Sequence, residues 1–76
     1  MSNYVGRLRD YEAILKGTIS VDGHALEFID HTKREEPLTS EQKQVMDELR
    51  KSTISSLAKL EGLLKHFYDI FPEIKS

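Results

Sequence analysis

Residues 18–28 read TISVDGHALEF, and the structure that they adopt separates an α+β fold from an all-α fold. Apolar and polar residues alternate on both sides of Asp22-Gly23, a dipeptide that suits the positive φ angles of a type I′ turn. A two-residue loop pairs Ile19 with Leu26 on one face. This pattern predicts a two-stranded β-hairpin around Asp22-Gly23, and hence an α+β fold.

A helix is the alternative for the same residues. Ser20 can serve as its N-cap, and the run Ala-Leu-Glu-Phe-Ile at residues 25–29 is as favourable locally for a helix. Such a helix continues to about Glu36. On this alternative the chain is an all-α, three-helix protein.

A short helix is predicted before this segment, over residues 3–16. Ser2 or Asn3 can cap it, and Gly17 stands where a helix C-cap is expected. Its apolar residues recur at spacings of three and four: Tyr4, Leu8, Tyr11 and Leu15. On the hairpin interpretation, residues 30–38 form a charged linker.

A long amphipathic helix is predicted over residues 40–71. Thr39 and Gln42 have the spacing of a capping box, and Pro72 ends the helix at or before Phe71. Apolar residues and one threonine follow spacings of three and four along it: Met46, Leu49, Thr53, Leu57, Leu60, Leu64, Phe67 and Phe71.

The length of this helix raises the question of what covers it. At 1.5 Å per residue it is about 47 Å long, whereas a compact chain of this size is about 30 Å across. Either the Ser/Thr-rich residues 52–56 break the helix, or another chain covers the overhang. We expect a single small domain, 1–76, that forms a homodimer or higher oligomer. The expected interface consists of Met46, Leu49, Leu57, Leu60, Leu64, Phe67 and Phe71.

Composition narrows the class of function. The sequence contains no cysteine, which excludes disulfides and thiolate metal sites, and its three histidines are scattered. We therefore expect no enzyme, no cofactor and no metal. A formal net charge of −2 makes nucleic-acid binding unfavourable. No window approaches the roughly 18 apolar residues of a membrane span, so we expect a cytoplasmic protein without membrane contact.

Two groups of side chains merit testing as ligand sites. His31, Lys33 and Arg34 form a basic cluster that could bind a small anion if an oligomer gathered several copies. His24, Glu27 and His31 share one face only if the segment is helical, so the hairpin interpretation breaks this metal-ligand set.

The long helix opens with Leu38-Thr39-Ser40-Glu41-Gln42, followed by Val45-Met46 and Leu49-Arg50. These residues resemble helix openings in small phage proteins that sequester cyclic-nucleotide signals. The resemblance covers under a third of the chain, and the second long helix of those proteins has no counterpart in the expected fold. The resemblance implies a ligand-sequestering function.

The sequence thus predicts a non-catalytic regulatory or inhibitory protein that self-associates through its long helix and binds another protein. The alternative is an oligomer of phage or plasmid type that binds or sequesters an anion or nucleotide. A DNA-binding regulator is a weaker alternative, because the chain lacks a basic helix.

Overall fold

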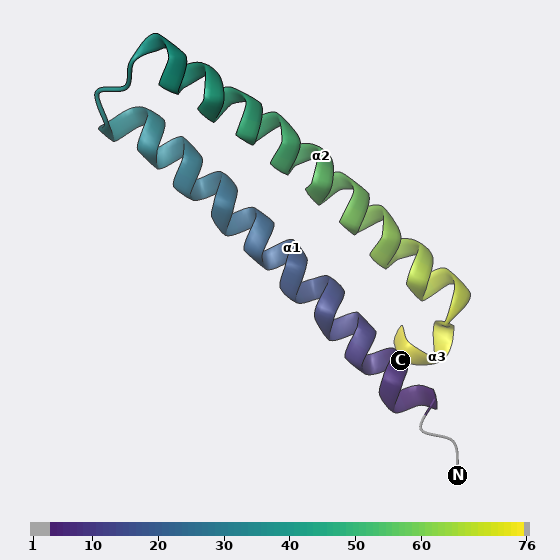
Figure 1. Ribbon diagram of the computed structural model, residues 1–76. Coiled ribbons are helices and arrows are strands. Elements are labelled where there is room, and N and C mark those ends of the chain that lie inside the picture. Colours follow the sequence, from purple (N-terminus) through teal and green to yellow (C-terminus); the bar gives the residue numbers. More distant parts are fainter. Residues whose placement is uncertain (1–3, 76) are drawn as a thin grey trace.

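Two long antiparallel helices make up almost the whole molecule. The computed structural model describes residues 4–75. Helix α1 spans Tyr4–Glu35, α2 spans Ser40–Ile70, and the short α3 spans Pro72–Lys75. Figure 1 shows α1 and α2 side by side, joined by a tight connection at one end, with α3 beside the start of α1 at the other end.

The predicted β-hairpin is wrong, and the all-α alternative fits. Residues 18–28 lie in the middle of α1, and no glycine among the described residues has a positive φ angle. A two-stranded hairpin is marginally stable by itself, whereas a helix places Ile19, Leu26 and Ile29 on one side, where α2 covers them. The three-helix expectation also changes, because its first two helices merge into one.

The limits of α1 therefore differ from the prediction. The helix runs through Gly17, so this glycine is not a C-cap, and residues 30–35 of the expected linker are helical. The helix ends before Glu36, whose conformation Pro37 restricts. The predicted N-caps Ser2 and Asn3 lie outside the described residues.

Helix α2 forms largely as the sequence predicts. The Thr39 hydroxyl accepts a hydrogen bond from the Gln42 amide at 3.1 Å, and the Gln42 side chain accepts one from the Thr39 amide at 2.9 Å. Both halves of the capping box are thus present. The helix ends at Ile70, before Pro72, as expected. It is unbroken through residues 52–56, so the alternative of a break there is wrong.

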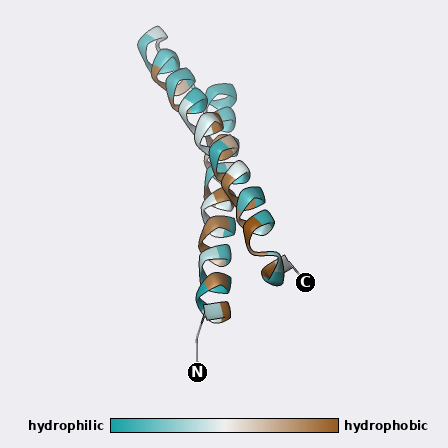
Figure 2. Cartoon of the chain, turned by 90° about the vertical axis from the view of Figure 1, so that its right-hand side faces the viewer, coloured by the Kyte–Doolittle hydropathy of each residue, from teal (hydrophilic) through white to brown (hydrophobic). Residues whose placement is uncertain are grey.

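Helix α3 closes the end of the hairpin where the chain termini lie. Ile74 is only 3% exposed, the least exposed apolar side chain of those that form the core. The Phe71 ring lies with its centroid 6.2 Å from that of Tyr4 and 5.2 Å from that of Phe67. Figure 2 shows that apolar residues are denser towards this end than towards the connection.

The overhang expected of a single long helix does not occur within the chain, because α1 is as long as α2. The result is a rod of 58 × 17 × 16 Å with a radius of gyration of 17.0 Å, against about 11 Å for a compact chain of this length. No helix in residues 4–75 is long and apolar enough to cross a membrane.

Candidate functional site

The two long helices meet along residues spaced alternately by three and four, the pattern of antiparallel helices packed side by side. We call these the inner positions. Apart from Val5 and Arg50, all of them are buried or half-buried. In α1 they are Val5, Leu8, Glu12, Leu15, Ile19, Asp22, Leu26, Ile29 and Lys33. In α2 they are Met46, Arg50, Thr53, Leu57, Leu60, Leu64 and Phe67, and Phe71 continues the series at the C-cap.

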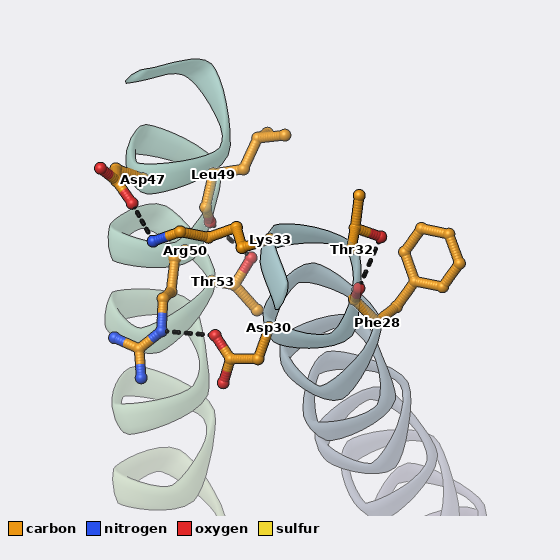
Figure 3. Close-up of polar contacts among 8 residues, drawn as sticks. All are labelled: Phe28, Asp30, Thr32, Lys33, Asp47, Leu49, Arg50 and Thr53. Atoms are coloured by element: carbon orange, nitrogen blue, oxygen red, sulfur yellow. Dashed lines mark hydrogen bonds and ion pairs between the residues drawn. The ribbon is translucent and has the colours of Figure 1, made fainter. Parts of the chain in front are cut away.

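The charged residues at inner positions all have polar partners. Lys33 donates to Asp47, and Arg50 Nε donates to Asp30 at 2.9 Å. Figure 3 shows the two ion pairs one above the other, each linking a residue of α1 to a residue of α2. Along the same seam, the Tyr68 hydroxyl donates to Glu12. In the described residues no buried side-chain nitrogen or oxygen lacks a hydrogen bond.

These contacts shift the ionisation of two carboxylates. The hydrogen bond from Lys33 holds the pKa of Asp47 below its usual value. The hydrogen bond from Tyr68, with a smaller contribution from the charge of Lys16, lowers the pKa of Glu12. In each case the bond favours the charged form of the acid.

The side chains that form the interhelical ion pairs and most of the large exposed apolar side chains lie on opposite faces of the hairpin. Asp30, Asp47 and Tyr68, which reach across to the other helix, each follow an inner position by one residue. We call their side the polar face. Most exposed large apolar residues instead precede an inner position by one. We call these the apolar face: Tyr4, Tyr11, Ile14, Val21, Phe28, Val45, Leu49, Leu63 and Ile70.

Helix geometry explains why both helices contribute to the same face. Each residue is rotated by about 100° from the previous one, so the residues before and after an inner position point to opposite sides of the seam. Because α1 and α2 are antiparallel, the preceding residues of both helices lie on one side. In Figure 3 the Phe28 ring projects from α1 away from Asp30 and Lys33.

The apolar face is large for a single chain. Its side chains are 44% to 69% exposed, Phe28 most of all. The accessible surface of the chain is 5967 Å², whereas a compact monomer of 8.8 kDa exposes about 4,800 Å². This excess of roughly 1,200 Å² belongs to the whole surface of the elongated chain, and it is larger than the ~800 Å² that each partner buries in a standard protein–protein interface.

A shallow hollow of about 360 Å³ beside this face is lined by Arg7, Asp10 and Tyr11. Two further shallow hollows open beside the face. One, of about 350 Å³, lies near the termini and is lined by Leu15, Leu63, His66, Phe67, Ile70 and Phe71. The other, of about 360 Å³, lies near the connection and is lined by Leu38, Glu41, Gln42, Val45 and Met46. Their linings are mostly apolar and suit side chains of another protein better than a charged ligand.

The structure separates the residues of the expected interface. Leu49 lies on the apolar face, whereas the other six occupy inner positions against α1: Met46, Leu57, Leu60, Leu64, Phe67 and Phe71. Sequence reasoning missed Ile14, Val21 and Phe28 as a surface group. Their seven-residue spacing was the available signal, but it places them together only if residues 18–28 are helical.

The expected anion cluster is spread out. Lys33 is held by Asp47, while His31 and Arg34 are exposed elsewhere on α1. No hollow described above is lined by any of the three.

The metal-ligand set is not assembled, although its segment is helical. His24 Nδ1 lies 3.7 Å from a Glu27 oxygen, but His31 is two turns away, about 10 Å along the axis. In residues 4–75 no group of three or more His, Cys, Asp or Glu side chains is placed to hold a metal ion.

Comparisons with known proteins add no relative. No family model, curated protein or solved structure matches the chain. The function is therefore inferred from the surface of the hairpin.

Proposed function

We propose that this chain is a non-catalytic regulatory or inhibitory protein that acts by binding protein chains through its apolar face, copies of itself included. The observation that supports the proposal is the gathering of nine large, exposed apolar residues on one face of a two-helix hairpin. A concentration of exposed apolar side chains on one face is characteristic of interaction sites.

The position of the polar contacts between the helices also supports the apolar face as the binding surface. The interhelical ion pairs and the Glu12–Tyr68 bond lie at the polar face and hold the hairpin together. A two-helix layer with one apolar face needs a second layer to cover that face. Another pair of helices is the simplest cover.

Light scattering tests the proposal at micromolar concentration. We expect a mass of at least twice 8.8 kDa for the unmodified chain. Leu63→Glu, which buries a charge in the interface, should reduce the mass to that of a monomer while circular dichroism stays helical. The matched control is Ala58→Glu at an exposed position of α2, which should leave the mass unchanged.

Binding of another protein is tested with the same two variants. Tagged chains are used to capture proteins from the native cell, and a true partner should be retained by Ala58→Glu and lost with Leu63→Glu. A protein captured equally by both variants does not use the apolar face. Monomeric behaviour of the unmodified chain, together with equal capture by both variants, would refute the proposal.

A ligand-sequestering function is the second candidate. The expected fold had no counterpart of the second long helix of the small phage proteins that the sequence resembles. In the structure, α1 is a second long helix of 32 residues. Thermal denaturation with a panel of cyclic nucleotides tests it. A rise in Tm with one nucleotide, absent with inorganic phosphate, would favour this candidate.

A further inference from the structure

On α1, the outer edge of the apolar face carries a row of residues that is complementary to an antiparallel copy of itself. Residues spaced by seven lie in a row on it: Arg7, Ile14, Val21, Phe28 and Glu35. The row is basic at one end, apolar in the middle and acidic at the other end. Two such rows placed antiparallel match apolar with apolar and base with acid.

The corresponding rows on α2 have a different character. The outer row consists of Val45, Ser52, Lys59 and His66, and so is mainly polar. The row closer to the inner positions has Leu49 and Leu63 on either side of Ser56. An antiparallel copy places Leu49 opposite Leu63, with Ser56 near the centre, so α2 is complementary to α2.

We propose that two copies of this chain stack their apolar faces around a two-fold axis perpendicular to the helices, forming an antiparallel four-helix bundle in which α1 packs on α1 and α2 packs on α2. This inference rests on the proposed function and specifies its partner as a second copy. It places Val21 and Ser56 beside the axis. It also places Phe28 opposite Ile14 of the second copy.

The hairpin's own contacts show that the two helices are in register for this arrangement. Asp22 accepts a hydrogen bond from Ser56 at 2.9 Å, so these residues lie at the same level of the rod. Val21, next to Asp22, therefore lies at about the same level as Ser56. One two-fold axis serves both helix pairs.

The alternative two-fold axis, parallel to the helices, stacks α1 on α2 of the second copy. The contacts Asp22–Ser56 and Asp30–Arg50 fix which residues of α1 and α2 lie at the same height along the hairpin. With the parallel axis, Val21 therefore lies near Lys59 of the second copy, and Phe28 lies near its Ser52. Apolar side chains would face a lysine and a serine. The perpendicular axis avoids both pairings.

Charge complementarity supports the same choice. Arg7 and Glu35 lie at opposite ends of α1, and the perpendicular axis brings Arg7 of each copy beside Glu35 of the other. The parallel axis instead gathers both Glu35 residues at one end of the bundle. Opposite charges across an interface favour the correct register and orientation.

Disulfide trapping tests the orientation cleanly, because the chain contains no cysteine. Under mild oxidation Val21→Cys should form a covalent dimer rapidly at low micromolar concentration. Ala13→Cys, at an exposed position of α1 that follows an inner position and so lies away from the apolar face, controls for random collision and should cross-link slowly. In a mixture of Val21→Cys with Lys59→Cys, the Val21 homodimer should predominate over the mixed dimer.

Charge reversal gives a second test, independent of disulfides. Arg7→Glu and Glu35→Arg should each weaken dimerisation by about five- to tenfold, because each places like charges together. The double variant should restore the affinity to near that of the unmodified chain. Analytical ultracentrifugation measures the dissociation constants.

The outcomes separate this inference from the proposed function. A dimer in which the Val21–Lys59 disulfide predominates, or in which the double charge reversal fails to restore affinity, would overturn the arrangement and leave a self-associating protein. A monomer at all micromolar concentrations would overturn this arrangement, and it would refute the proposed function as well if Ala58→Glu and Leu63→Glu also captured proteins equally. Rapid Val21 cross-linking with restored affinity supports the inference.

Discussion

The Tyr68 hydroxyl donates a hydrogen bond to the carboxylate of Glu12, 56 residues away in the sequence. The bond joins α2 to α1 close to the chain termini, and the side chain of Glu12 is only 15% exposed. Lys16 Nζ lies 3.6 Å from the same carboxylate oxygen. A tyrosine and a lysine on two helices thus converge on one acid.

We predict that the hairpin becomes less stable in acid, because protonation weakens this contact and the ion pair of Asp47. The pKa values of Glu12 and Asp47 are lowered from 4.5 and 3.8 in the folded chain. Acids of this kind contribute stability above their unfolded pKa and lose it as the pH falls through the folded pKa. The free energy of unfolding, from urea titrations at fixed protein concentration, should therefore fall between about pH 5 and pH 2.

Tyr68→Phe isolates the contribution of Glu12. Removing the donor should return the pKa of Glu12 towards its ordinary value, so the loss of stability in acid becomes smaller. Tyr11→Phe makes the same chemical change on the apolar face, away from the Glu12–Tyr68 hydrogen bond, and is the control. An unchanged pH dependence in Tyr68→Phe would show that the hydrogen bond does not control the ionisation of Glu12.

We predict that Gly23→Ala stabilises the protein by about 0.5 to 1 kcal/mol, the difference in helix propensity between the two residues. A Cβ atom at Gly23 would meet nothing within 4 Å. Urea unfolding monitored by circular dichroism measures the change. Gly62→Ala, in the equally open middle of α2, is the matched control and should give a similar gain.

The same variant discriminates between the two folds considered for residues 18–28. In a type I′ turn the glycine has a positive φ angle, and alanine there destabilises the protein. A loss of stability in Gly23→Ala, with a gain in Gly62→Ala, would contradict the continuous α1 helix.

We predict that Leu60→Ala costs about 2 kcal/mol or more, whereas Lys59→Ala changes stability by less than about 0.5 kcal/mol. Leu60 is an inner position and is half-buried against α1, while Lys59 is exposed. Urea titration compares the two variants at the same protein concentration. Equal stability of the two variants would mean that α2 does not pack on α1 through the side that carries Leu60.

We predict that Ile74→Ala destabilises the end of the hairpin where the termini lie. Ile74 is buried by its neighbours, and truncation of a buried isoleucine costs about 2 to 5 kcal/mol. Ile54→Ala makes the same chemical change at a residue that is 40% exposed, so it should cost less. Hydrogen exchange should increase in the first turns of α1 only in Ile74→Ala. An equal response of both variants would argue against a structural role for α3.

Much of α2 could be predicted from local signals. The capping box at Thr39 and Gln42, the stop before Pro72 and the three-and-four spacing between them each involve residues close in sequence. Such signals act before any tertiary contact forms. Six of the seven expected interface residues lie on one side of α2, where α1 of the same chain packs against them.

Residues 18–28 could not be assigned in this way, because their local preferences for helix and strand are nearly balanced. Asp22-Gly23 suits a turn, yet Asp22 is also an inner position, where its carboxylate accepts the Ser56 hydrogen bond. That partner is 34 residues away, beyond the reach of any local pattern. The apolar face was missed for the same reason, since it exists only if α1 is continuous.

The sequence by itself determined a long capped helix, an excess of apolar side chains along it, and a chain without cysteine. Tertiary structure decided that α1 is a helix of matching length and that the excess apolar surface lies on one face, opposite the ion pairs. The physical reason is that a 31-residue helix has an apolar side along its whole length, and only a helix of similar length can cover that side within one chain.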